Sequence, residues 1–295
     1  MKSINHDLEV TKDYHDLFGM NLDGVVIATP PATHYQIASE ALQNGLNVMI
    51  EKPITTNSQD AEKLVELAQK KNRVLMVGHT FIYNNAVHVL KKLMDSGDIG
   101  KTLYVDAARL NLGLYSRELN VLWDLAPHDL SILHFLLEAN PVSIEVFGTA
   151  CMMKDIHDVV HMNMIFPGNI LAHVHVSWLA PVKVRRVTVV GSKKMVVYND
   201  IEAADKIKIY DKGVDPPDYT QAYAEFQCAY RNGDIVIPNI RMTEPLRQEC
   251  THFVECIRDN TPCRTPGQDG LRVVKILEAA QNALMNNHHE EVFTW

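Results

Sequence analysis

Two groups of residues in this sequence combine side chains suited to moving protons and stabilising charge. The first is Glu51-Lys52-Pro53, which follows the apolar run at 48–50. An ammonium group such as that of Lys52 can stabilise negative charge that develops on a substrate oxygen. The second is Asp124 and His128, which lie one turn apart on one face if both are helical. An imidazole titrates near neutral pH and suits proton removal, and a neighbouring carboxylate can hold it and favour its charged form.

Each group also has a purely structural explanation. A Glu-Lys pair before a proline is often a solvated strand end, because proline cannot donate to a sheet ladder and favours an extended preceding residue. Asp is favoured as a helix N-cap, and Pro127 is tolerated in a first helical turn. On that interpretation His128 is a partly buried helix residue. The residues themselves leave both interpretations open, and a capping Asp124 can also face a site.

Elements that would position the first group alternate regularly between strands and helices. Apolar runs predict buried strands, and amphipathic stretches with capping residues predict helices. The strands are expected at 22–29, 47–50 and 74–77, and the helices at 33–44, 57–71 and 85–95. This order predicts a parallel sheet with right-handed crossovers. Glu51 and Lys52 then lie at the carboxyl end of a strand, where ligands bind in open α/β sheets.

After Gly100 the pattern changes to short strands separated by turn residues. They predict an antiparallel or mixed sheet. Strands are expected at 102–110, 143–149, 159–166, 169–177, 183–190 and 195–199, and helices at 125–138, 244–259 and 268–286. The segment 211–243 is polar and is expected to be irregular. We therefore predict two domains, 1–100 and 101–295.

Composition excludes several classes of partner. The net charge of -8 argues against nucleic acid, and no apolar run approaches the ~20 residues of a membrane span. The five cysteines are odd in number and lack C-x-x-C spacing, which indicates reduced thiols in a cytoplasmic protein. His173 and His175 would share one face of a strand, but no third ligand has a matching spacing. We expect no metal site.

Several segments resemble the Gfo/Idh/MocA oxidoreductases, the glucose–fructose oxidoreductase and inositol dehydrogenase family. The similar segments are VVIATPPATH at 25–34, EKP at 51–53, GHTF at 78–81, WDLAPHD at 123–129 and GLRVV at 270–274. Members use NAD or NADP, and the resemblance implies a Rossmann-like parallel domain followed by an α+β domain with a large, mostly antiparallel sheet. Within the family, the segments at 109–113 and 123–129 look most like sugar-nucleotide dehydrogenases.

The resemblance also implies residue roles. Catalysis would fall to Lys52, Asp124 and His128, in the oxidation of a secondary hydroxyl of a sugar, cyclic polyol or sugar nucleotide. The residues implied to contact the cofactor are Ala28, Thr29, Pro30, His34, Glu51 and Lys52. The residues expected near the substrate are Tyr83, Arg109 and Asn111, although Tyr83 is also explained as a core residue. Family members often have the Lys52–Pro53 bond cis, and a homo-oligomer through the second-domain sheet is expected.

One expected motif is missing. Dinucleotide folds open with a strand and G-x-G-x-x-G, whose glycines let the backbone approach the pyrophosphate, and this sequence contains no such motif. The first βαβ unit is therefore expected to be absent. The strand at 25–28 would then be an exposed edge, and NAD(P) affinity would be much reduced. The alternative function is a non-catalytic remnant that oligomerises or binds sugar.

Overall fold

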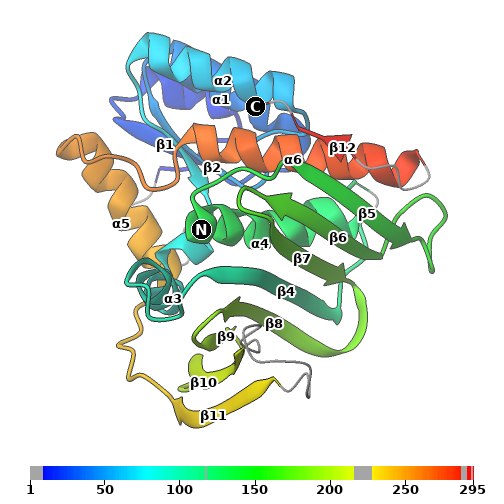
Figure 1. The fold of residues 1–295 in the computed structure, drawn as a ribbon. Coiled ribbons are helices and arrows are strands. Elements are labelled where there is room, and N and C mark those ends of the chain that lie inside the picture. The colour runs from blue at the N-terminus through cyan, green and yellow to red at the C-terminus, as the bar shows by residue number, and fades with distance from the viewer. Residues whose placement is uncertain (1–8, 117, 216–227, 287–290, 294) are drawn as a thin grey trace. The chain divides into compact units, whose positions relative to one another are not determined.

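The computed structural model describes residues 9–116, 118–215, 228–286, 291–293 and 295 (Figure 1). The chain forms two compact units. The first comprises residues up to Gly78 together with Thr251–Leu271, and the second comprises His79–Cys250 and Arg272–Trp295. This division differs from the predicted boundary at residue 100. The helix at residues 85–95 contacts a helix and a strand of the second unit and belongs to that unit. Residues 251–271 return to the first unit.

The first unit is built on three parallel strands in the order β1-β2-β3. They are β1 (Gly24–Ile27), β2 (Asn47–Glu51) and β3 (Leu75–Gly78). Two helices connect them, α1 (His34–Gln43) and α2 (Ser58–Lys71), which lie side by side (Figure 1). Asn57 caps α2 by accepting a hydrogen bond from the Asp60 N–H at 2.8 Å. The predicted strand–helix alternation is confirmed.

Strand β1 is an edge of this sheet. Among the residues that the structure describes, it pairs with β2 alone, and Val26 is 57% exposed. The short 3-10 helix η1 (Tyr14–Gly19) and β1 together line a largely apolar cavity of about 140 Å³. The predicted edge position is confirmed.

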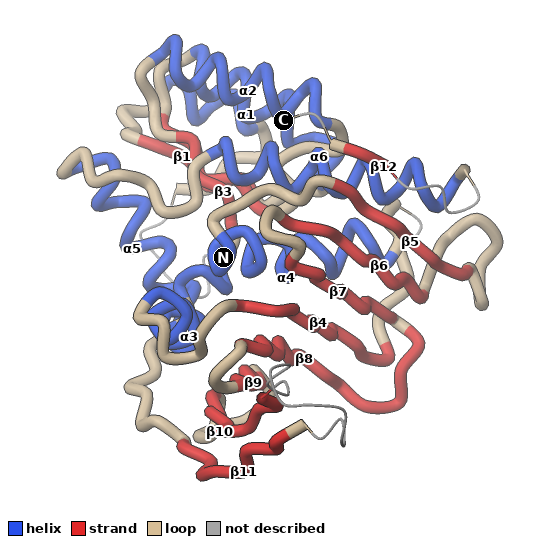
Figure 2. The backbone as a smooth tube through the Cα atoms, viewed as in Figure 1, coloured by secondary structure: helices blue, strands red, loops and turns tan. Residues whose placement is uncertain are grey.

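The second unit contains a nine-stranded sheet in the order β11-β10-β9-β8-β4-β7-β6-β5-β12, whose strands follow one another in Figure 2. Its pairs are antiparallel except for β4 with β7. The strands are β4 (Thr102–Leu112), β5 (Ser143–Thr149), β6 (Val159–Phe166), β7 (Ile170–Ser177), β8 (Leu179–Gly191), β9 (Met195–Asn199), β10 (Ile207–Asp215), β11 (Ala229–Val236) and β12 (Glu291–Val292). The mixed sheet agrees with the prediction.

The α-helices of the remaining chain are α3 (Asn85–Asp95), α4 (Val121–Leu137), α5 (Pro245–Arg258) and α6 (Gly267–Met285). Helix α4 packs on β7, β4 and β6, whose inward side chains alternate with outward ones. Val160, Met162 and Met164 are fully buried. This alternation is the pattern of a sheet with one covered face. None of the described helices is long and apolar enough to cross a membrane.

The prediction that 211–243 is irregular was wrong in part. The end of β10 and all of β11 fall in this segment, and residues 216–227 lie outside the described part. Strand β11 is largely exposed and most residues of β10 are half-buried, so neither strand alternates clearly between buried and exposed residues. Their order comes from backbone pairing at the end of a sheet, for example Tyr210 with Ile235. Pairing between distant segments leaves no such signal in a local pattern.

Candidate active site

The carboxyl ends of the three parallel strands bring the first predicted group together. Strand β2 ends at Glu51, and the following Lys52–Pro53 bond is cis, as the resemblance implies. Thr29 follows β1 and is exposed, as are Ala28 and Pro30. Glu51 and Lys52 are half-buried. Because parallel strands end at the same edge, these side chains lie together at the carboxyl edge of the sheet. We call this edge, formed by residues 28–30 and 51–53, the lip.

His34 ties two of these strand ends together. The imidazole is fully buried, with Nδ1 2.8 Å from the Pro53 carbonyl oxygen and Nε2 2.8 Å from the Thr29 carbonyl oxygen. Both partners are acceptors, so a neutral ring donates to only one of them and the imidazolium donates to both. A cofactor contact by this ring, which the resemblance implies, would have to replace one of these bonds. His34 therefore positions the lip.

Glu51 packs against the glycine that ends β3. Its Oε2 accepts the Lys52 N–H at 3.3 Å. A Cβ at Gly78 would lie 3.0 Å from the same oxygen, closer than most such contacts. Residue 78 must therefore be small for the Glu51 carboxylate to keep this position.

The second predicted group lies on α4. The helix begins at Val121, and its cap is Asn120, whose Oδ1 accepts the Trp123 N–H at 3.2 Å. The interpretation of Asp124 as the N-cap was therefore wrong, as was the predicted start at 125. Asp124 lies in the first turn, and its Oδ2 accepts a hydrogen bond from Trp178 Nε1 at 3.0 Å. His128 follows one turn later, so both side chains lie on one face.

A buried ion pair lies beside this helix. Arg109 on β4 donates to both carboxylate oxygens of Asp129, at 2.8 and 2.9 Å, and the two side chains are 5% and 2% exposed. The guanidinium also stacks over Phe81 at 4.4 Å, and the edge of the same ring meets His128 at 5.1 Å between centroids. Arg109 is therefore held in place by Asp129. It also lines the small cavity beside His128, so its expected position near a substrate stays a prediction.

A small cavity of about 70 Å³ opens next to His128. Asn111 lines it, as predicted for a residue near a substrate, together with Lys183 and Arg185 of β8. The two cations were not predicted, because nothing in their local sequence separates them from solvated surface lysines and arginines. Asp129 was part of the quoted WDLAPHD segment, but its pairing with Arg109 was missed. Tyr83 is 1% exposed, which matches the core explanation rather than a contact with sugar.

The strand histidines form a stack rather than a ligand set. His175 stacks on His161 at 3.9 Å between ring centroids, and His173 Nδ1 lies 2.8 Å from Asn163 Oδ1. Burial and the neighbouring imidazoles lower the pKa of His175 to about 4. Burial also lowers the pKa of His161. Both rings are therefore neutral at physiological pH.

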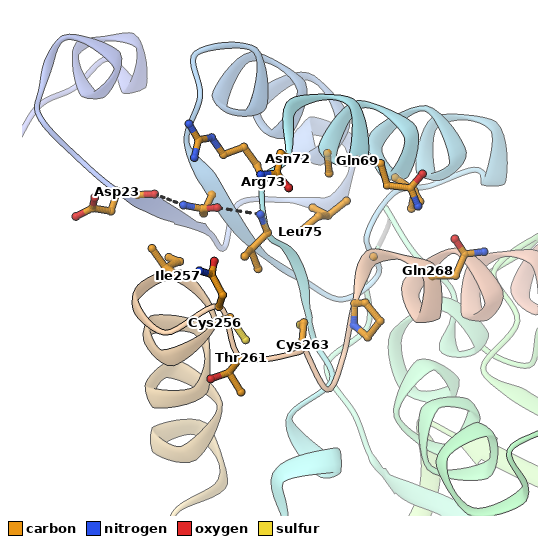
Figure 3. Close-up of a pocket in the computed structure, with 17 residues that line it drawn as sticks. Asp23, Gln69, Asn72, Arg73, Leu75, Cys256, Ile257, Thr261, Cys263 and Gln268 are labelled. Atoms are coloured by element: carbon orange, nitrogen blue, oxygen red, sulfur yellow. Dashed lines mark hydrogen bonds between the residues drawn. The ribbon is translucent and has the colours of Figure 1, made fainter.

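A cavity of about 580 Å³ lies in the first unit at the amino ends of the strands (Figure 3). The Glu51 lip is at the opposite ends of these strands. Asn47 lies at its wall, where Nδ2 donates to the Asp23 carbonyl at 2.7 Å and Oδ1 accepts the Val74 N–H at 2.9 Å. Ligands of open parallel sheets bind at the carboxyl ends, so the lip, rather than this cavity, is the candidate site of the first unit.

Two family models match the chain in order. Residues 3–79 match the NAD-binding Rossmann fold of the GFO/IDH/MocA oxidoreductase family, and residues 87–197 match the GFO/IDH/MocA C-terminal domain. Together they cover more than half of the sequence. The chain thus combines an NAD-binding Rossmann part with the C-terminal domain of an oxidoreductase family. It belongs to the GFO/IDH/MocA family.

Named relatives include sugar-nucleotide and polyol dehydrogenases. The chain is 33% identical over 132 residues to UDP-N-acetylglucosamine 3-dehydrogenase of Acidithiobacillus ferrooxidans, covering 44% of this chain and 41% of that protein. It is 27% identical over 139 residues to inositol 2-dehydrogenase of Salmonella typhimurium, covering 46% and 41%. The chain thus matches less than half of the length of these two curated relatives.

Solved structures extend the similarity in fold over nearly the whole chain. The Acidithiobacillus ferrooxidans enzyme GnnA matches with a TM-score of 0.79 at 23% identity, over 96% of this chain and 85% of that one. GenD2 from gentamicin A biosynthesis, solved in complex with NAD, matches with a TM-score of 0.81 at 21% identity, over 99% and 85%. These likenesses establish the mixed α/β fold.

Proposed function

We propose that the protein is an NAD(P)-dependent dehydrogenase that oxidises a secondary hydroxyl of a sugar, cyclic polyol or sugar nucleotide. The observation that carries this proposal is the position of Glu51, Lys52 and Pro53 at the carboxyl end of β2, inside a segment that matches an NAD-binding Rossmann fold. The named dehydrogenases among the relatives support it. Their printed substrates suggest the substrate class, and the cations Lys183 and Arg185 beside His128 favour one with an anionic group.

The described residues fit one side of the cofactor. Thr29 and Glu51 offer a hydroxyl and a carboxylate at the lip, which suits the ribose and nicotinamide end. The sequence contains no G-x-G-x-x-G to cradle the pyrophosphate, so we expect weak NAD(P) binding by this chain. When bound, the nicotinamide would accept the hydride from the carbinol carbon.

The chain's own residues would then handle the proton and the charge. His128 would take the hydroxyl proton, which an imidazole does efficiently near neutral pH. Asp124, one turn away and oriented by Trp178, would stabilise the imidazolium that results. The Lys52 ammonium would donate to the substrate oxygen and stabilise its developing negative charge. Lys52 belongs to the first unit, and Asp124 and His128 belong to the second.

Steady-state assays test this assignment directly. Purified full chain is supplied with millimolar NAD⁺ or NADP⁺ and with UDP-N-acetylglucosamine or myo-inositol, and the reduced nicotinamide is followed by its absorbance. We expect oxidation of at least one substrate, and a fall in kcat of roughly 10²–10⁴-fold in Lys52→Ala and in His128→Ala. Lys70→Ala removes an exposed lysine and serves as the control.

Near-normal rates in both variants would refute the catalytic roles. Absence of oxidation, combined with sugar binding or self-association, would favour the non-catalytic alternative. Calorimetric titration tests the prediction of weak NAD(P) binding separately from the catalytic roles. Micromolar NAD⁺ affinity would contradict weak binding and would leave the proposed roles of Lys52 and His128 unchanged. Light scattering measures the molar mass in solution and tests the proposed homo-oligomer. We propose a cytoplasmic location for the protein.

A further inference from the structure

The first unit contains a cluster of soft metal ligands away from the proposed active site. His252 and Cys256 lie four residues apart on α5, and Cys263 lies on the loop between α5 and α6. His252 and Cys256 are 3% and 2% exposed, and Cys263 is half-buried. One ligand atom from each residue lies within 4.8 Å of the others. This is the one such group of three or more among the described residues.

The spacing of these atoms fits a tetrahedral metal. His252 Nε2 lies 3.4 Å from Cys256 Sγ. Zinc bonds of about 2.3 Å to sulfur and 2.0–2.1 Å to nitrogen separate neighbouring ligand atoms by about 3.5 Å. A hydrogen bond from the Cys256 thiol to the imidazole would also explain this one distance. It does not explain the second thiol beside the same pair.

The surroundings of His252 match those of a metal-bound histidine. The imidazole of His252 is 3% exposed and lies against the Cys256 thiol. Its Nδ1 lies 3.7 Å from Glu255 Oε2. A carboxylate behind the ligating ring is a common outer partner in zinc sites, because it fixes the orientation of the ring. The Arg264 N–H, which donates to Nε2 at 3.1 Å, would be displaced by a metal.

The cluster borders a cavity that gives an ion access to it. Cys256 and Cys263 both line the 580 Å³ cavity at the amino ends of the strands, and Figure 3 shows them on its α5 side. Cysteine binds metals as the thiolate, so an ion that replaces the protons of two thiols releases them to the solvent.

We propose that His252, Cys256 and Cys263 bind one soft divalent metal ion, zinc, with a water molecule from the cavity as the fourth ligand. Three protein ligands and one open position form a common zinc geometry. The ion would tie the loop to α5. Because Thr265 on this loop accepts the Val77 N–H at 2.8 Å, the same ion would anchor the loop that pairs with β3. Zinc should therefore raise the melting temperature of the protein.

Cobalt substitution and zinc competition test the proposal on the full, reduced chain. We expect one Co²⁺ per chain, with the intense visible bands of tetrahedral Co²⁺ and a thiolate charge-transfer band, both displaced by Zn²⁺. Competition with a chromogenic chelator should give a zinc affinity that falls roughly 100-fold or more in Cys256→Ser and in Cys263→Ser. Cys250→Ser is the matched control, since Cys250 is exposed on the same helix and lies outside the cluster.

Three results would overturn the site. They are a cobalt complex without the charge-transfer band, zinc affinity unchanged in both cluster variants, and a disulfide between Cys256 and Cys263, with no bound metal, in protein purified without reductant. Circular dichroism checks that each variant is folded. If Cys256→Ser does not fold, the zinc affinity of Cys263→Ser and the cobalt spectrum of the unmodified chain still test the site, because Cys263 is only half-buried.

Discussion

The lip of the first unit and the α4 region of the second hold their functional side chains by different means. At the lip, His34 contacts two main-chain carbonyls, and the Glu51 carboxylate accepts from a main-chain N–H. Beside α4, side chains hold one another, as in the bidentate pair of Arg109 and Asp129.

This difference predicts how substitutions act. Lys52 and Glu51 are half-buried, so changing them should affect chemistry more than stability. The ion pair beside α4 is buried, and removing one partner leaves an uncompensated charge inside the protein. We therefore expect stability and function to separate at the lip and to fall together beside α4.

The largest effect is expected from Asp129→Asn. The substitution leaves the buried Arg109 guanidinium without its carboxylate and should lower the free energy of unfolding by about 3–5 kcal/mol. Urea denaturation measures this loss. Asp98→Asn, an exposed change of the same kind, should cost less than about 0.5 kcal/mol. A loss below about 1 kcal/mol in Asp129→Asn would contradict the distinction between the two regions.

His34→Gln should have the next largest effect. The buried imidazole links the ends of β1 and β2 through the carbonyl oxygens of Thr29 and Pro53. A glutamine side chain would not reach both oxygens, and the carbonyl left without a hydrogen bond should cost about 1–3 kcal/mol. Thermal unfolding measures the change. Gln36→Ala, at a side chain on the same helix that contacts Tyr14 and Glu40 instead, is the control. An unchanged melting temperature in His34→Gln would show that the lip does not depend on this ring.

Gly78→Ala tests whether function can change at the lip without a loss of stability, because the added methyl group would displace the Glu51 carboxylate. The new methyl group would lie about 3 Å from that carboxylate, which is flexible enough to shift. Stability should change by less than about 1 kcal/mol, while the KM for NAD(P) rises and kcat changes little. Gly19→Ala meets no atom within 4 Å and serves as the control. A change confined to kcat would instead place Glu51 in the chemical step.

The smallest effect concerns the histidine stack on the sheet of the second unit. The folded pKa of His175 is about 4, while that of an unfolded histidine is near 6.5. Between these values the unfolded chain binds the proton, so stability falls as pH drops from about 6.5 towards 4. His161 and His173 oppose protonation and Asp106 favours it.

After allowance for solvent screening, we expect His175 to account for a loss on the order of 1 kcal/mol. His175→Gln should flatten the dependence of unfolding free energy on pH in this window, and His15→Gln should not. An identical pH slope in His175→Gln and the unmodified chain would contradict the assignment.

Much of the first unit could be predicted from sequence, because its strands are continuous apolar runs with clear ends. Val48, Met49 and Ile50 are all buried, and proline ends the strand as expected. The motifs at the lip are contiguous in sequence, so a resemblance to a family could be seen in them. Strand β11 was missed because backbone pairing, rather than an apolar pattern, orders it.

The sequence by itself determined the parallel strands, the lip residues and the family. Tertiary structure alone decided which distant side chains meet. Arg109 and Asp129 are twenty positions apart on a strand and a helix, and Cys263 reaches the His252 and Cys256 pair through a loop that pairs with β3. Local propensity depends on neighbours along the chain, whereas an ion pair or a ligand cluster depends on packing between elements, and no short pattern encodes that packing.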